Sequence, residues 1–218
     1  MQRCLKSVFL LCFLSLVLSS CFKNLIKTDT YYQSDFSKDT SATKFTVQGF
    51  YNNNTLFGPV AQRLAVFNGV PVFGYYNDNI AELDLNGLSQ HYSLRIEYDL
   101  YIHDNWNNDL FQMKVNGVLL LSTGFSNNSA VQQAYPNFLG NGSALSPAGA
   151  GSYTTQLPGA CSLIHSTNGT SEYKILMTIQ DNSPSFKMIL SDAGGFQNQP
   201  CQRSWSISNL KITGILSN

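Results

Sequence analysis

The 218-residue sequence predicts an all-β fold, an antiparallel two-sheet β-sandwich of the jelly-roll or lectin-like type. Three observations support this prediction. Short apolar runs alternate with a period of two, as in half-buried strands, and two Asn-Gly dipeptides stand between such runs. After the N-terminal segment, no long stretch has helical periodicity. So many strands must bury one face of each sheet against a second sheet.

The chain begins with the pattern of an export signal. Arg3 and Lys6 are basic, and residues 8–18 form an apolar run that is too short for a permanent membrane-spanning helix. The tetrad at residues 18–21, Leu-Ser-Ser-Cys, resembles the lipobox of bacterial lipoproteins. This resemblance implies a signal peptide at residues 1–20, a lipid on Cys21 and attachment to the membrane of a bacterial cell envelope.

The residues after the lipobox are polar. Phe22 is not the aspartate that retains many lipoproteins at the inner membrane, which favours the outer membrane. Residues 22–42 are rich in Thr, Ser, Asp and Lys and lack sustained periodicity, as in a flexible spacer. We therefore predict a lipidated N-terminus and tether at residues 21–43 and a β-sandwich domain at residues 44–218.

Composition limits the partners. Charged residues make up 12% of the chain, against about 25% in an average soluble domain, and the net charge is zero. The basic footprint of a nucleic-acid-binding domain is absent, so we predict no nucleic-acid partner.

The five cysteines leave one pair after processing. Cys4 and Cys12 belong to the signal and Cys21 to the lipobox, so Cys161 and Cys201 remain. In an oxidising compartment we predict that these two form a disulfide. The alternative is two separate buried thiols.

The predicted strands follow in chain order. Alternation begins at residues 45–51 and returns at residues 94–102, 173–179 and 186–190. The dipeptides at residues 68–69 and 116–117 predict hairpins, because a type I′ turn needs positive φ at both central residues.

Two segments depart from simple alternation. Near the C-terminus, the apolar residues Trp205 and Ile207 stand at odd positions, whereas Leu210 and Ile212 stand at even positions. This change in the alternation predicts a β-bulge around residues 208–209. The segment at residues 126–160 is rich in Asn, Gly, Ser, Ala and Pro and has no clear strand. Long loops of this kind are often functional, so a binding surface is expected there; a merely variable loop is the alternative.

Several motifs occur in the order of a recurrent extracellular domain. They are GLSQH at residues 87–91, DNWNNDLF at 104–111, VNG at 115–117, STGFSN at 122–127 and RSWSISNL at 203–210. This series resembles secreted or surface-anchored bacterial β-sandwich domains with the pattern IDSWDG, PDxFxVxVDG and ESWGIDNV. The resemblance implies the fold, the compartment, and a lectin-like or calcium-dependent role. Asn107, Arg203 and Ser208 stand where that pattern has acids.

The turn after the strand at residues 94–102 is a candidate calcium site. Asp104, Asn105, Asn107 and Asp109 place four side-chain oxygens within six residues, and calcium prefers oxygen ligands from flexible loops. The alternative is an ordinary turn, in which Asp and Asn bond to nearby backbone. Apart from calcium, we predict no cofactor.

Aromatic residues are candidates for stacking on a sugar ring. Trp106 and Trp205 fall inside the family motifs, and Tyr135 lies in the long loop. The alternative for each is packing in the core, where a tryptophan of a sandwich is usually found.

The strongest argument for an enzyme is Glu97-Tyr98-Asp99. Residues at i and i+2 of a strand share one face, so the two carboxylates could act as nucleophile and acid in a jelly-roll glycoside hydrolase. The third carboxylate of the comparable β-glucanase strand is missing, and we predict no catalytic residue.

Taken together, these observations predict a lipid-anchored, extracytoplasmic and non-catalytic recognition domain that binds carbohydrate. The expected site lies between the turn at residues 104–109 and the loop at residues 126–160. The alternative is a structural or adhesive envelope protein that binds other proteins through a sheet face or edge.

Overall fold

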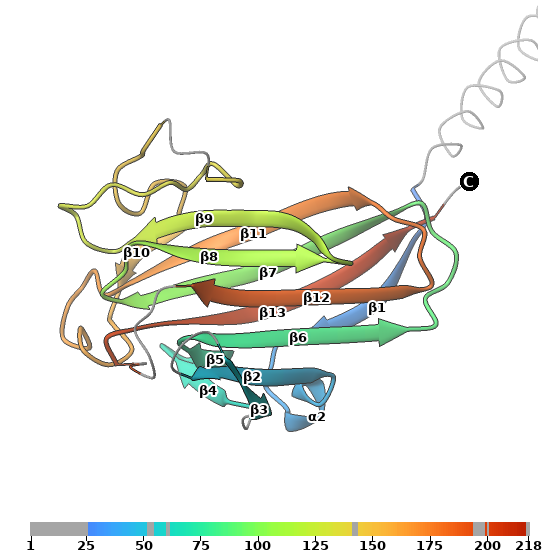
Figure 1. Ribbon diagram of the computed structural model, residues 1–218, viewed down its shortest axis with the longest axis horizontal. Helices are drawn as coiled ribbons and strands as arrows, with labels where there is room; N and C mark the ends of the chain where they lie inside the picture. Colours follow the sequence, from blue (N-terminus) through green and yellow to red (C-terminus); the bar gives the residue numbers. More distant parts are fainter. Residues whose placement is uncertain are drawn as a thin grey trace, which may run out of the picture.

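The computed structural model describes residues 26–51, 55–59, 62–140, 144–193, 199 and 201–216. They form thirteen strands and one short helix (Figure 1): β1 Thr28–Ser34, α2 Asp39–Ala42, β2 Phe45–Tyr51, β3 Thr55–Pro59, β4 Leu64–Phe67, β5 Val70–Tyr76, β6 Asn79–Asn86, β7 Ser93–Asp104, β8 Asn107–Val115, β9 Val118–Ser126, β10 Thr154–Leu157, β11 Thr170–Gln180, β12 Ser185–Ala193 and β13 Arg203–Ile215.

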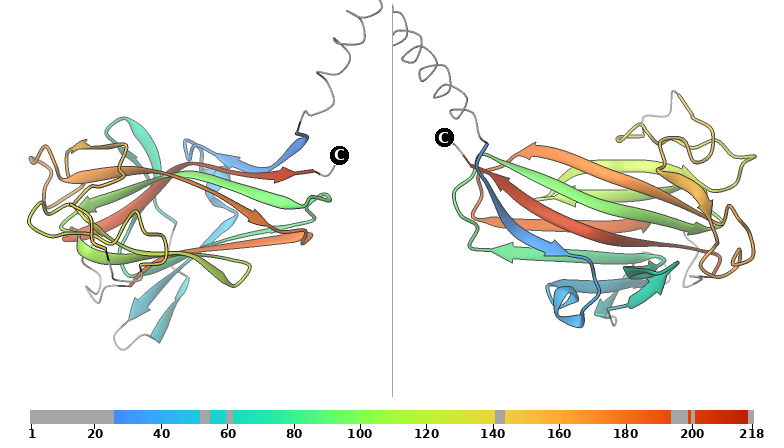
Figure 2. Two further views of the ribbon diagram at one scale, coloured as in Figure 1. Left: turned by 90° about the horizontal axis from the view of Figure 1, so that it is seen from above. Right: turned by 180° about the vertical axis from the view of Figure 1, so that it is seen from behind.

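The strands form two antiparallel sheets that lie face to face (Figure 2). The seven-stranded sheet has the order β10-β11-β7-β13-β5-β4, with β1 added beside β13. The six-stranded sheet has the order β3-β2-β6-β12-β8-β9. The predicted two-sheet β-sandwich is therefore confirmed.

The core lies between the two sheets. Leu94, Ile96 and Leu100 point inward from β7, and Met188 and Leu190 point inward from β12; all five are fully buried. Residues of the other parity, such as Arg95, Glu97 and Ile189, point outward, as the period of two in the sequence predicted.

The predicted turns and the predicted bulge are present. Asn68 and Asn116 have φ values of 49° and 48°, and each is followed by a glycine that also has positive φ, as a type I′ hairpin requires. In β13 the register with β7 shifts between Ser208 and Lys211, and Asn209 has a φ of 52°. This bulge lets residues on both sides of it face the core.

The predicted tether at residues 21–43 is wrong for most of its length. β1 pairs with the C-terminal half of β13 from Thr28 to Ser34, and Phe36 is 2% exposed. This strand was not predicted because its sequence lacks alternating apolar residues. Only two of its tyrosines pack against the core, and hydrogen bonds to β13 hold it in the sheet. The domain thus begins by residue 28. The predicted signal peptide and Cys21 lie outside the described residues.

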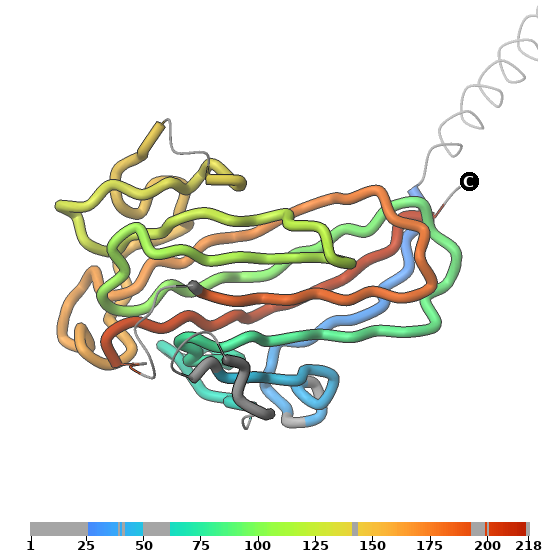
Figure 3. The backbone as a smooth tube through the Cα atoms, in the orientation of Figure 1, coloured from blue at the N-terminus to red at the C-terminus, as the bar shows by residue number. Residues whose placement is uncertain are grey.

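The long segment at residues 126–160 is more structured than predicted. It contains β10 and a bridge between Gln133 and Ser146, and it runs along the edge of β9 (Figure 3). The Ser122 N–H of β9 donates to the Phe138 carbonyl at 2.6 Å, so part of this sheet edge is covered.

The loops gather at the two ends of the sandwich. One end carries residues 104–107, 126–131 and 201–203; the other carries residues 87–92 and 181–184, beside the start of β1 and the end of β13 (Figure 1). Any loop-built site therefore belongs to one end or the other.

Candidate functional site

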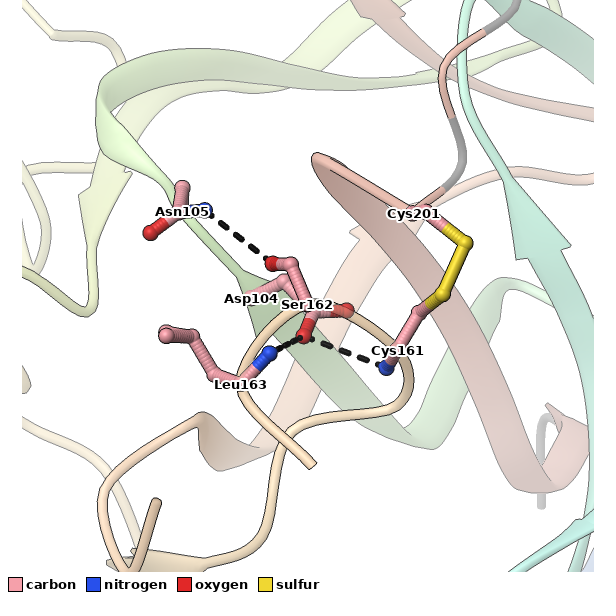
Figure 4. Close-up of a disulfide and its surroundings, with 6 residues drawn as sticks. All are labelled: Asp104, Asn105, Cys161, Ser162, Leu163 and Cys201. Atoms are coloured by element: carbon pink, nitrogen blue, oxygen red, sulfur yellow. Dashed lines mark hydrogen bonds between the residues drawn. A yellow bond between two sulfur atoms is a disulfide. The ribbon is translucent and has the colours of Figure 1, made fainter. Parts of the chain in front are cut away.

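The turn that follows β7 is built around a buried carboxylate. Asp104 is 0% exposed, and its Oδ1 accepts N–H groups of Cys161 and Leu163 at 3.2 and 2.9 Å (Figure 4). Burial raises the pKa of Asp104, while these hydrogen bonds act in the opposite direction. Asp104 therefore fastens the loop at residues 160–163 to the end of β7.

A disulfide ties the same loop to the start of β13. Cys161 and Cys201 are bonded, as predicted, with their Cα atoms 4.9 Å apart. The Asn105 N–H donates to the Gln202 carbonyl at 2.9 Å, and the Asn105 amide donates to Ser162 Oγ at 3.1 Å. The disulfide and these bonds bring three distant segments together.

A small polar cavity opens where these segments meet. It has a volume of about 200 Å³ and is lined by the five residues Asn105, Asn107, Asn128, Gln202 and Arg203, which we call the asparagine pocket. Asn128 Nδ2 donates to Asn107 Oδ1 at 2.9 Å, and Asn107 Nδ2 donates to the Asn105 carbonyl at 3.3 Å. These bonds orient the amides of its rim.

Arg203 forms the buried part of the asparagine pocket and is 1% exposed. Its Nη1 lies 2.6 Å from Asp109 Oδ1, and its Nη2 lies 3.8 Å from Asp78 Oδ1 and 3.6 Å from Asp192 Oδ2. The guanidinium also lies over the ring of Trp106, 5.2 Å from its centre. One cation is thus held among three carboxylates and an aromatic face.

Asp192 is the most deeply buried of these acids. Desolvation raises its pKa to about 6, against the opposing effects of the Asp78 N–H, the Trp205 indole and Arg203. The raised value indicates that burial outweighs the attraction of Arg203 for the ionised carboxylate.

The four predicted calcium ligands do not share one site. Asp104 binds the loop at residues 160–163, Asp109 pairs with Arg203, and only Asn105 and Asn107 line the asparagine pocket. Asp109 also accepts the Asn107 N–H at 2.8 Å, the local turn bond given as the alternative. Within the described part of the chain, no group of three or more His, Cys, Asp or Glu side chains is arranged for a metal ion. Calcium binding itself stays a prediction.

The predicted stacking residues are in the core instead. Trp106 and Trp205 are 0% exposed, and Tyr135 is 6% exposed and stacks on Phe125 at 4.8 Å. Both indole N–H groups have partners: Trp106 donates to the Ser204 carbonyl and Trp205 to Asp192. The stacking prediction is wrong for all three, and the packing alternative holds, because each ring fills space between the sheets.

Glu97 and Asp99 do point to the same outer face of β7. Glu97 pairs with Arg95 at 2.8 Å, whereas Asp99 pairs with Lys174 at 2.9 Å and accepts from Asn209 at 2.6 Å. Each carboxylate is engaged by its own partners, so this strand lends no support to a glycosidase pair.

Sequence reasoning found part of the asparagine pocket. It identified Asn105, Asn107 and the loop that contains Asn128, but it missed Gln202 and the position of Arg203. The signal that could have found them is the predicted disulfide, because Cys201 must carry the next two residues to the loop that contains Cys161.

Comparisons with known proteins do not assign a family. The chain matches no family model and no curated protein. Among the described residues, no helix has the length and apolar character needed to span a membrane.

Similar solved structures include carbohydrate-binding modules. A family 35 module from Clostridium thermocellum is 11% identical, with a TM-score of 0.36, and the match covers 85% of this chain and 97% of that one. The CBM2 module of an evolved Dit protein of Lactobacillus casei BL23 phage J-1 is 12% identical, with a TM-score of 0.46, covering 89% and 99%.

An exo-beta-1,3-galactanase from Phanerochaete chrysosporium is 11% identical, with a TM-score of 0.34, over 87% of this chain and 29% of that one. All three TM-scores are below 0.5, so none carries an argument about function.

Proposed function

We propose that this chain is a non-catalytic, lipid-anchored recognition domain of a bacterial cell envelope that binds carbohydrate at the asparagine pocket. The observation that carries the proposal is the convergence of Asn105, Asn107, Asn128 and Gln202 from three loops above the buried Arg203.

The chemistry of the rim suits sugar hydroxyl groups. Each side-chain amide offers two N–H donors and a carbonyl acceptor, and a sugar hydroxyl both donates and accepts. Asn105, Asn107, Asn128 and Gln202 are exposed, whereas Arg203 is held from below by carboxylates. A neutral ligand fits because it leaves the balance of charge around Arg203 undisturbed.

The size of the asparagine pocket limits the ligand. At about 200 Å³ it is smaller than the roughly 300–1,000 Å³ of pockets for drug-sized ligands. It therefore suits one sugar unit, at the end or side of a longer glycan. The residues that line the pocket follow the end of β7 and precede β13, whereas β1 begins beside the end of β13, at the opposite end of the sandwich (Figure 2). This placement is compatible with a lipid on Cys21.

The proposal is tested with the full-length chain purified in detergent and a panel of envelope and plant glycans. The double variant Asn107→Ala with Asn128→Ala removes two amides of the rim, and we expect its affinity to fall at least tenfold. Asn86→Ala, an exposed amide on β6, is the matched control. Unchanged binding by the double variant would refute this site. Failure of the native chain to bind any glycan, with a protein partner recovered by cross-linking, would favour the structural or adhesive role.

A further inference from the structure

A second and larger cavity lies at the opposite end of the sandwich. It has a volume of about 580 Å³, between the β6–β7 loop and the β11–β12 loop. Its lining, which we call the tyrosine pocket, consists of Gln90, His91, Tyr92, Gln180, Asp181 and Asn182. β7 runs from this end of the sandwich to the other (Figure 1), where Asn105 of the asparagine pocket follows it, and its twelve residues span about 36 Å.

The walls of the tyrosine pocket are fixed to the sheets. The Tyr92 N–H donates to the Ile215 carbonyl at 3.0 Å, and the Asp181 N–H donates to the Tyr92 carbonyl at 3.2 Å. The Asp181 carboxylate accepts from Asn116 Nδ2 at 2.8 Å and from the Ser183 N–H at 2.9 Å. Because the two loops bond to each other and to β13, little ordering would be needed when a ligand binds.

A buried histidine supports these walls. His91 is 3% exposed; its Nδ1 lies 2.8 Å from the Ser89 carbonyl oxygen and its Nε2 lies 3.4 Å from Asp181 Oδ1. The Tyr31 hydroxyl of β1 lies 3.2 Å from the same Nδ1. His91 thus links the pocket to β1 and orients Asp181 from behind.

The lining selects a class of ligand. Tyr92 is 51% exposed and offers an aromatic face, while Gln90, Gln180 and Asn182 offer amides around it. None of the described lining residues is a lysine or arginine, and Asp181 is an acid, so an anion is disfavoured. The polar walls exclude a wholly apolar ligand. A ring with one apolar face and hydroxyl groups at its edge meets all of these conditions.

We infer that the tyrosine pocket is a second carbohydrate-binding site, for a neutral glycan that stacks on Tyr92. Its volume lies within the roughly 300–1,000 Å³ that ligand pockets have, so it accommodates more than one sugar unit. The inference rests on the lining of this pocket and not on the proposed function of the asparagine pocket. Two sites at opposite ends make the domain bivalent, so that it holds two glycan chains together.

The test uses the full-length chain and an immobilised panel of neutral glucans, galactans, mannans and xylans. Four proteins are compared: the native chain, Tyr92→Ala, the Asn107→Ala/Asn128→Ala variant, and a protein that carries all three changes. We expect Tyr92→Ala to weaken binding to one set of glycans about tenfold, as loss of an aromatic contact predicts. Tyr153→Ala, at a tyrosine that is 72% exposed elsewhere, is the matched control and should bind as the native chain does.

The outcomes separate the two sites. Loss of all binding in the asparagine variant, with Tyr92→Ala unaffected, overturns the second site and leaves the proposed function standing. The reverse result overturns the asparagine pocket alone, and a native chain that binds no glycan overturns both. Gln90→Ala with Gln180→Ala, both exposed side chains, repeats the test if Tyr92→Ala does not fold, and unchanged binding by it also overturns the inference.

Discussion

Removing the Cys161–Cys201 disulfide tests how the loops around the asparagine pocket are held. The bond joins residues 40 positions apart. In the chain-entropy treatment, a closed loop of this length contributes about 4 kcal/mol to the free energy of unfolding at 25 °C. The double change Cys161→Ser and Cys201→Ser leaves the bonds of Asp104 to Cys161 and Leu163 available, so the loss should come mainly from the unfolded state.

The assay is equilibrium unfolding in guanidinium chloride of the native chain and the double serine variant. We expect the variant to lose about 4 kcal/mol, with a fall in Tm of about 8–16 °C at the 2–4 °C per kcal/mol typical of this size. The reduced native chain is the control and should match the variant. A loss below about 1 kcal/mol in both would refute the reasoning, because the cross-link would then restrict the unfolded chain far less than its loop length predicts.

Three further predictions follow from the buried acids. Asp104→Ala removes two hydrogen bonds to a carboxylate and should lower the free energy of unfolding, measured by calorimetry, by about 2–4 kcal/mol. The control Asp84→Ala, at an exposed position, should change this free energy by no more than about 0.5 kcal/mol. If both variants lose the same free energy of unfolding, Asp104 does not anchor the loop. The pKa of Asp192 in the folded chain is about 6, above its ordinary 3.8, so its contribution to stability is present below pH 4 and lost as the pH rises to about 6. The stability of the native chain relative to Asp192→Asn should therefore fall by up to about 3 kcal/mol between pH 4 and pH 7, and a constant difference would show that Asp192 does not titrate there. The predicted calcium site implies a higher Tm in millimolar calcium than in chelator, because a bound ion stabilises the folded chain; an equal Tm, as the partners that Asp104 and Asp109 already have would give, would contradict that site.

The strands were predictable where one face is apolar. Residues 94–102 alternate between apolar and polar because one face of the strand is buried. The shift of this alternation after Ile207 marks the bulge in β13, so both features can be seen in the sequence. β1 could not be found this way, since its pairing depends on where β13 leaves an open edge. That is a property of the assembled sheet and not of residues 28–34.

The site was predictable only as a region. The loops at residues 104–109 and 126–160 do meet, yet Trp106 faces the core while its neighbours Asn105 and Asn107 face the pocket. The direction of each side chain depends on the turn geometry after Asp104, which has a φ of 64°. Composition does not encode that angle. The tyrosine pocket was not predicted: the motif at residues 87–91 contains Gln90 and His91, but Asp181 and Asn182 lie far away in the sequence.

Arg203 gives a physical reason for one departure from the motif series that the sequence resembles. The pattern has an acid at this position, whereas here a guanidinium lies among Asp78, Asp109 and Asp192. A fourth carboxylate in this place would need a cation from solution to offset the repulsion. Arg203 supplies that positive charge from the chain itself.

The pairing of β1 with β13 bears on how the domain carries mechanical load. β1 enters at the end opposite the asparagine pocket and runs lengthwise beside β13 from Thr28 to Ser34. A pull between Thr28 and a ligand in that pocket acts along both strands, while the hydrogen bonds between them lie across that direction. The bonds are then loaded together in shear and do not open one after another. If the chain is anchored through the residues before Thr28 and binds a surface through the asparagine pocket, as proposed, this arrangement resists peeling from the N-terminal end.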